Sequence, residues 1–291
     1  MYTLCYSQDT MKKLFSNILV PIDVNAPSEY VIKEAIDLAR PFECNVHLLF
    51  MLPQPGARYA HLRNWFTNEE GIGQRILKLY SGYILHLPPP LRLYTAIEKG
   101  RHETCITNYA IKNHIDLVVL GITHPILSAG WFMHSGINRL SKKTGCPVLS
   151  LQSRANLDSV RNIVMPVSSS FLPIRKLMFA TYLAKKYNSR LHLVTLSGSQ
   201  PNAEADTNAY LLKAYRLIRD NTEVPVECRT LPGENIATIT LQYAKDVKAD
   251  LIVINPGKES LLSGFINRIF SRYLFNESRI PVMTVAPPLP S

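Results

Sequence analysis

Two histidines and a run of serines are the side chains that most readily suggest chemistry in this sequence. His124 and His134 belong to the residue type that most often binds metal ions. Their spacing of ten positions does not place two ligands on one face of a helix, and no cysteine or acidic residue stands close to them. We therefore predict no metal site, although both imidazoles are able to contact an anion.

The serine run at 168–170 is typical of a polar loop between a strand and a helix, where a hydroxyl caps the helix. The sequence contains neither the G-x-S-x-G motif of many hydrolases nor a phosphate loop with its lysine. Hydrolysis and phosphoryl transfer thus have no motif to support them. We assign no catalytic residue and favour a protein that is not an enzyme.

These residues lie in a sequence that contains an internal repeat. The run Asn-Ile-Leu-Val-Pro-Ile-Asp at 17–23 returns as Asn-Ile-Val-Met-Pro-Val-Ser at 162–168, an offset of 145 positions. The run at 116–121 returns at 250–255, an offset of 134. A repeat of this period indicates two copies of one domain. The smaller second offset places 11 extra residues in the first copy, within 52–67, where we expect a packing or interface patch rather than a lid.

Each copy alternates short β-branched apolar runs with longer segments of helical period, which favours a parallel sheet covered by helices on both faces. The first copy predicts strands at 17–22, 45–51, 91–97, 116–121 and 147–151, and helices at 27–41, 68–86, 102–113 and 134–143. The second copy predicts strands at 161–167, 190–196, 224–230, 250–254 and 281–285, and helices at 172–187, 204–221, 234–247 and 265–276.

Composition sets limits on the class of protein. The chain has 291 residues, 46% hydrophobic and 19% charged, and no apolar run reaches the roughly 18 residues of a membrane span. The first residues have no secretory pattern, and the five scattered cysteines suit a reducing compartment, so we expect a cytoplasmic protein without a membrane partner. The net charge is +10, but the basic residues are dispersed, which makes nucleic acid an unfavoured partner.

The order of these elements and motifs resembles the universal stress protein family in its tandem two-domain form. The resemblance covers about 14–152 and 159–287. Its markers are the strand end Val20-Pro21-Ile22-Asp23, the glycines Gly100 and Gly233 followed by Ile106 and Ile239, the strand at 116–121, and Cys146-Pro147-Val148.

The resemblance implies an α/β fold of two tandem, doubly wound domains with five-stranded parallel sheets of the adenine nucleotide alpha hydrolase-like type. We expect the first domain at 14–152 after an N-terminal extension at 1–13, and the second, degenerate domain at 159–287. The two are expected to pack as a pseudo-dimer, imitating the homodimer that single-domain members form through the last strand.

In ATP-binding members of the family the pattern G-x2-G-x9-G-[ST] follows the fourth strand, and an aspartate at the end of the first strand contacts the nucleotide. Glycines let backbone N–H groups approach the phosphates, and the next helix N-terminus favours negative charge. In the second half the pattern falls on Asn255, Lys258, Arg268 and Ile269, and Ser168 replaces the aspartate. In the first half the resemblance implies a nucleotide site formed by Pro21, Asp23, Gly121, His124, His134 and Ser135.

We interpret the chain as a tandem universal stress protein without the standard ATP loop, which acts under stress by binding or regulation. No cofactor is assigned with certainty, and ATP in the first half is the one considered. One alternative is an adenine-nucleotide binder with slow hydrolysis in the first half. Another is a basic module that binds nucleic acid or another anionic partner. We expect the two halves of the chain to pair with each other, and we leave open whether the chain also assembles into a homo-oligomer.

Overall fold

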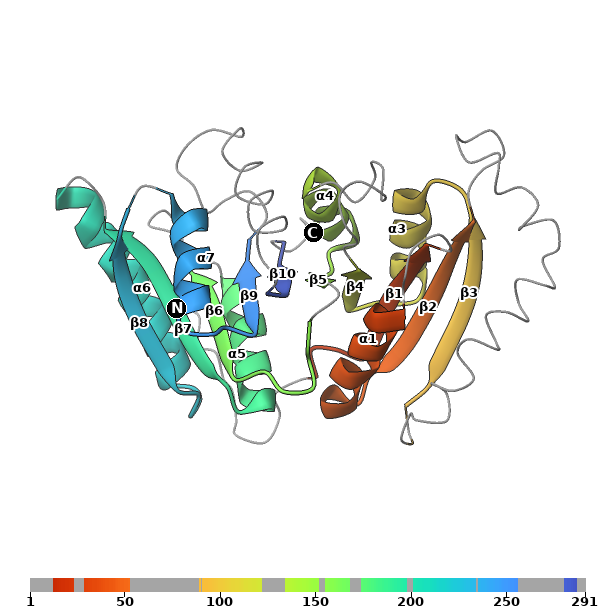
Figure 1. Ribbon diagram of the computed structural model, residues 1–291, viewed down its shortest axis with the longest axis horizontal. Helices are drawn as coiled ribbons and strands as arrows, with labels where there is room; N and C mark the ends of the chain where they lie inside the picture. Colours follow the sequence, from red (N-terminus) through yellow and green to blue (C-terminus); the bar gives the residue numbers. More distant parts are fainter. Residues whose placement is uncertain are drawn as a thin grey trace.

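The computed structural model describes residues 13–23, 29–52, 89, 91–121, 134–151, 155–167, 174–197, 201–233, 235–255 and 280–286. It has an α/β architecture (Figure 1). The first half contains β1 (Asn17–Asp23), α1 (Glu29–Phe42), β2 (Asn45–Leu52), β3 (Leu93–Lys99), α3 (His102–Lys112), β4 (Leu117–Gly121), α4 (His134–Thr144) and β5 (Val148–Leu151). The second half contains β6 (Asn162–Pro166), α5 (Ile174–Tyr187), β7 (Arg190–Ser197), α6 (Pro201–Arg219), β8 (Val226–Pro232), α7 (Ile236–Asp246), β9 (Leu251–Ile254) and β10 (Val282–Thr284).

Every predicted strand is present, but the third strand of each half lies two residues later than predicted. β3 and β8 each continue to a glycine, Gly100 or Gly233, whose φ is +148° or +145°. Side chains strongly disfavour that backbone conformation, so the glycine marks where the strand ends and the next helix approaches. The predicted helices at 68–86 and 265–276 and the residues 53–67 of the predicted insertion lie outside the described residues.

Each half has the same strand order. The first runs β3-β2-β1-β4-β5 and the second β8-β7-β6-β9-β10, with all pairings inside a half parallel. In each half the chain first adds two strands on one side of β1 or β6 and then adds two strands on the other side. The strand order therefore reverses between β1 and β4, and between β6 and β9. In such doubly wound sheets ligands bind at the carboxyl ends of the two strands beside this reversal.

The two halves meet through their last strands. β5 and β10 pair antiparallel, with Val148 opposite Thr284, Leu149 opposite Met283 and Ser150 opposite Val282. In Figure 1 these strands lie in the middle, between the red-to-yellow first half and the cyan-to-blue second half. The pairing covers both otherwise free edges, as a pseudo-dimer through the last strand predicts. It also joins the two five-stranded parallel sheets into one ten-stranded sheet.

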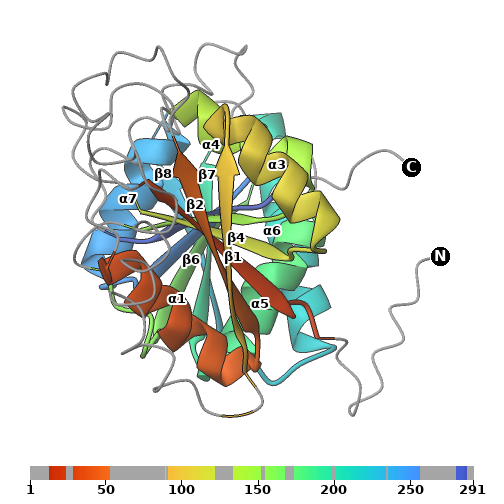
Figure 2. The same cartoon turned by 90° about the vertical axis from the view of Figure 1, so that its right-hand side faces the viewer.

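The hydrophobic core is organised by sheet face and not by half. One buried cluster packs α1, α5 and α6 on one face, and the other packs α3, α4 and α7 on the opposite face; both clusters contain residues of both halves. Figure 2 shows helices on either side of the sheet. On the first face Phe15 packs against Phe42, Phe179 and Tyr182, with ring centroids 5.4, 5.5 and 5.8 Å apart. The halves therefore share buried apolar surface beyond their strand pairing.

The aspartate before the fourth strand of each half has a structural role. The carboxylate of Asp116 accepts hydrogen bonds from the backbone amides of Ser16 and Asn17 at 2.8 and 3.1 Å. In the second half Asp250 accepts the two corresponding amides at 2.7 and 2.9 Å. These bonds align the start of the first strand with the start of the fourth, and thereby place the ends of the same strands side by side.

Candidate functional site

The structure brings three of the sequence-predicted site residues to one edge of the first-half sheet. Pro21 is buried near the end of β1, Asp23 is the last residue of β1, and Gly121 is the last residue of the neighbouring β4. His134 and Ser135 are the first two residues of α4, the helix that follows β4. His124 lies outside the described residues. Pro21, Asp23 and Gly121 thus lie at the strand-order reversal of the first half.

Gly121 is in close contact with the first turn of α1. A methyl group on its Cα would lie 2.3 Å from Cγ2 of Val31 and 2.7 Å from the hydroxyl oxygen of Tyr30. Real side chains do not approach this closely, so a residue larger than glycine would force the side chains of Val31 and Tyr30, or α1 itself, to shift. Gly121 therefore has a packing role, whether or not its amide also contacts a ligand.

Tyr30 presents a buried polar atom at the same place. Its hydroxyl oxygen is buried and has no hydrogen-bond partner among the residues that the structure describes. Burial raises the pKa of the phenol to about 12, so Tyr30 is uncharged at neutral pH. A buried hydroxyl without a partner costs on the order of 1–3 kcal/mol. The carboxyl edge of the first-half sheet thus contains a buried hydroxyl that no described residue satisfies.

The second half places different chemistry at the matching positions. Arg175 and Lys176 in α5 stand 145 positions after Tyr30 and Val31, and Asn255 stands at the position of Gly121. Lys176 is 1% exposed, and its ammonium donates a hydrogen bond of 2.5 Å to the carbonyl oxygen of Pro166, the last residue of β6. Asn255 is also buried. The edge that could receive a ligand in this half therefore holds the protein's own cation and amide.

Arg175 points to the junction of the two halves. Its guanidinium donates to the carbonyl oxygen of Ala286 at 2.8 Å, just beyond β10, and to that of Gly145 at 2.5 Å, just before β5. A planar guanidinium is well suited to bind two acceptors at once. Arg175 consequently joins α5 to both partners of the central strand pair.

Sequence reasoning missed Tyr30, Arg175 and Lys176. A signal existed, because the 145-position offset aligns a basic pair in α5 with an aromatic–apolar pair in α1. The periodicity of α5 alone did not reveal that Lys176 is buried, since a lysine next to the apolar stripe of a helix ordinarily lies at the surface with its charge in water.

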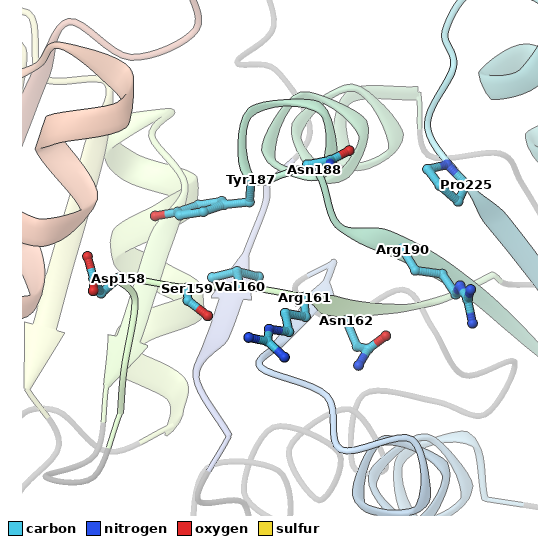
Figure 3. A pocket seen from close by; sticks show the side chains of 9 residues that line it. All are labelled: Asp158, Ser159, Val160, Arg161, Asn162, Tyr187, Asn188, Arg190 and Pro225. Carbon is cyan, nitrogen blue, oxygen red and sulfur yellow. The ribbon is translucent and has the colours of Figure 1, made fainter.

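An open hollow of about 640 Å³ lies at the other end of the second-half strands (Figure 3). Its lining includes Arg161, Asn162, Tyr187, Asn188 and Arg190, which come from the amino-terminal ends of β6 and β7 and the end of α5. It contains none of the sequence-predicted site residues. The hollow therefore lies at the opposite edge of the sheet from Pro21, Asp23 and Gly121.

The described residues contain no group of three or more histidine, cysteine, aspartate or glutamate side chains placed to hold a metal ion. None of the helices that the structure describes is long and apolar enough to cross a membrane.

Comparison with known proteins gives a consistent result. The model of the universal stress protein family matches residues 14–151 and again residues 159–286. The fold is similar to a universal stress protein from Archaeoglobus fulgidus, at 13% identity and a TM-score of 0.66 over 94% of this chain and 98% of that one. It is also similar to a functionally unknown protein from Pseudomonas aeruginosa, at 17% identity and a TM-score of 0.59 over 94% and 93%.

A third similar structure is the cytoplasmic domain of a prokaryotic cation chloride cotransporter, at 12% identity and a TM-score of 0.55 over 93% of this chain and 95% of that one. At these identities the likeness concerns the fold alone. A search of curated protein sequences found no significant match.

Proposed function

Since this chain belongs to the universal stress protein family and contains two family domains in tandem, we propose that it is a stress-related binding and regulatory protein. Its ligand crevice lies in the first half, and its second half serves as a permanent structural partner. The domain limits 14–152 and 159–287 and a cytoplasmic location belong to the same proposal.

The observation that carries the proposal is the difference between the two crevices. The first-half edge has Asp23 and Gly121 at the ends of neighbouring strands. Gly121 lies against the buried hydroxyl of Tyr30, which has no hydrogen-bond partner among the described residues. The matching edge of the second half has the buried side chains of Lys176 and Asn255. Among the residues that the structure describes, this edge thus has an aspartate, a glycine and a buried hydroxyl in the first half, and a lysine and an asparagine in the second.

The first-half crevice is expected to hold ATP weakly. His124 and His134 replace two glycines whose small size and free backbone would let amides converge on phosphates. A strained backbone costs on the order of 1–3 kcal/mol, and a lost charge-assisted hydrogen bond roughly 1.5–3 kcal/mol. Two such defects correspond to a loss of about 3–5 kcal/mol, or roughly 100- to 5,000-fold in affinity. A micromolar ATP site would become millimolar.

Calorimetric titration with ATP and magnesium tests this proposal. The unmodified chain should give no detectable binding at about 100 µM ATP, which is well below the roughly millimolar range. The double variant His124→Gly with His134→Gly should recover part of the affinity, and only in the first half. Tight binding by the unmodified chain would show that the histidines are ligands, and would favour the nucleotide-binding alternative.

That alternative is an adenine-nucleotide binder with slow hydrolysis in the first half. The feature that favours it is the position of Asp23 and Gly121 at the ends of adjacent strands. It predicts phosphate release from ATP that is lost in the variant Asp23→Ala and kept in the variant Ser168→Ala. Equal phosphate release by both variants would assign the hydrolysis to a contaminant or to another site.

A further inference from the structure

We infer that the junction between the halves selects for unlike halves, so that a first half pairs with a second half and rejects another first half. The selecting residues are Glu34 and Asp37 of α1, together with Phe15, which packs on aromatic side chains of α5. The inference deepens the proposed role of the second half as a structural partner. It does not depend on the ligand proposed for the first half.

The two helices that meet at the junction present opposite chemistry at matching positions. α1 and α5 stand 145 positions apart over their whole length, and they contact each other on one face of the sheet. Phe179 and Tyr182 of α5 therefore match Glu34 and Asp37 of α1. All four residues are buried, with exposed fractions between 3% and 7%. One half thus contributes an aromatic surface to the junction, and the other contributes a pair of carboxylates.

Phe15 extends from the first half onto the aromatic surface of the second. Its ring is fully buried and lies 5.5 Å from the ring of Phe179 and 5.8 Å from that of Tyr182. The halves are related by an approximate twofold axis through the β5–β10 pair. If another first half took the place of the second, Glu34 and Asp37 would stand where these two rings lie. Phe15 of each copy would then cover two carboxylates of the other, which is costly because an apolar ring cannot replace their water.

The partners of the two carboxylates explain why the unlike pair tolerates them. The carboxylate of Glu34 accepts a hydrogen bond of 2.6 Å from the backbone amide of Leu157, in the segment that leads into the second half. Asp37 pairs with Lys33 at 2.8 Å and with Arg40 at 2.9 Å on its own helix. A pair of two first halves lacks Leu157 and therefore leaves the Glu34 carboxylate without this donor.

Two second halves are also a poor match. The residue that stands 145 positions after Phe15 is Val160. In a pair of second halves, Phe179 and Tyr182 would thus lose the large ring that packs on both of them. A valine in its place leaves space unfilled in the core, which disfavours this pair as well. The unlike pair is the one arrangement in which the aromatic surface meets Phe15 and Glu34 meets its donor.

The experiment follows the pairing of halves that are no longer linked. A protease recognition sequence is inserted after Gln152 in the full chain, and the folded protein is cut there. The cut protein and the uncut chain are unfolded in urea and refolded by dilution. Native mass spectrometry then counts like and unlike pairs, which differ in mass. Unlike pairs should exceed like pairs at least about tenfold, whereas random pairing gives equal amounts of both.

Two variants and a control test the named residues. Glu34→Phe with Asp37→Tyr gives α1 the aromatic surface of α5 and should raise the share of first-half pairs at least about fivefold. Glu34→Gln with Asp37→Asn keeps the size of both side chains and removes their charge, and should raise this share about threefold even if the aromatic variant does not refold. Glu29→Phe, at an exposed position of the same helix, should leave the distribution unchanged.

The inference is overturned if like pairs are as frequent as unlike pairs in the cut protein. It is also overturned if neither variant changes the distribution, which would assign the selectivity to other residues. Failure of the cut protein to recover unlike pairs, where the uncut chain refolds, would show that the linker and not the junction brings the halves together. None of these results affects the ligand site proposed for the first half, which the titrations with ATP test separately.

Discussion

The ammonium group of Lys176 lies 2.5 Å from the carbonyl oxygen of Pro166, at the end of β6. This side chain is among the largest fully buried ones in the described part of the molecule. Burying a cation is costly unless polar groups surround it, so such a lysine depends closely on its partners. The carboxyl edge of the second-half strands at Lys176 is consequently part of the protein's own core.

We therefore expect Lys176→Ala to destabilise the protein by about 2–4 kcal/mol, since it removes the buried stem of the side chain and leaves the carbonyl group of Pro166 without its donor. Lys185→Ala, in the exposed last turn of the same helix, should change stability by less than about 0.5 kcal/mol. Urea unfolding measures both. Similar small effects for the two variants would contradict the packing described for Lys176.

The contact between Gly121 and α1 predicts a coupling between two residues. Gly121→Ala places a methyl group 2.3 Å from Cγ2 of Val31 and should destabilise the protein by about 1–3 kcal/mol. In the background Val31→Ala the same change should cost about 1 kcal/mol less, because the obstructing methyl group is gone. A double-mutant cycle of unfolding free energies tests this, and strict additivity of the two changes would show that they do not touch.

Arg175 should hold the junction of the halves. Arg175→Ala removes two charged hydrogen bonds to backbone carbonyl groups and should destabilise the protein by about 2–3 kcal/mol. Amide hydrogen exchange in β5 and β10 should accelerate more than exchange in β2 or β7. Arg161→Ala, whose guanidinium is exposed, serves as the control with unchanged exchange. Uniform acceleration in all four strands would show that Arg175 stabilises the fold without a special role at the junction.

A buried histidine recurs in both halves and predicts a dependence of stability on pH. Nδ1 of His47 lies 3.1 Å from the hydroxyl of Tyr109, and Nδ1 of His192 lies 3.0 Å from that of Tyr243. Burial lowers the pKa of both histidines below the ordinary value of 6.5; at His192 the nearby Glu227 partly opposes the shift. The folded state thus favours the neutral imidazoles.

The direction of this pH dependence follows from the different proton binding of the folded and unfolded states. Below pH 6.5 the unfolded chain takes up protons at these sites while the folded protein resists, so stability is full above this pH and is lost as the pH falls through the lowered pKa values. Urea unfolding between about pH 8 and pH 5 should show the decrease. The double variant His47→Gln with His192→Gln should have a flatter profile in this range. Parallel profiles for the two proteins would remove the histidines as its cause.

Glu34 provides an internal check on the interpretation of that profile. Its carboxylate accepts a hydrogen bond from the backbone amide of Leu157 at 2.6 Å, and burial raises its pKa. The raised pKa favours the folded protein as the pH falls, which is opposite to the effect of the histidines. Because Glu34 is present in both proteins, the difference between the two profiles isolates the histidines.

The strands, most helices and the twofold repeat could be predicted from the sequence because they depend on local periodicity. Gly100 and Gly233 could be recognised for the same reason, since each adopts a positive φ that glycine tolerates at its own position in the chain. The contacts of Tyr30 and Lys176 depend on how the first turn of a helix meets a strand that is distant in sequence, which no local pattern encodes. The sharing of both core layers between the halves likewise follows from the register of β5 against β10.

Gly121 shows where the pattern was ambiguous. A glycine after the fourth strand is expected both where amides approach a phosphate and where a helix approaches the sheet. The structure establishes the second role through Val31 and Tyr30. The first role remains a prediction, because it depends on a ligand.

The central claim is that ligand binding is confined to the first half, and the most direct test is an equilibrium titration of three proteins with ATP and magnesium up to about 10 mM. The proteins are the unmodified chain, Asp23→Ala in the first half and Ser168→Ala at the matching position of the second. We predict weak binding in the roughly millimolar range by the unmodified chain, its loss in Asp23→Ala and its retention in Ser168→Ala. Binding that survives in Asp23→Ala but is lost in Ser168→Ala would contradict the claim.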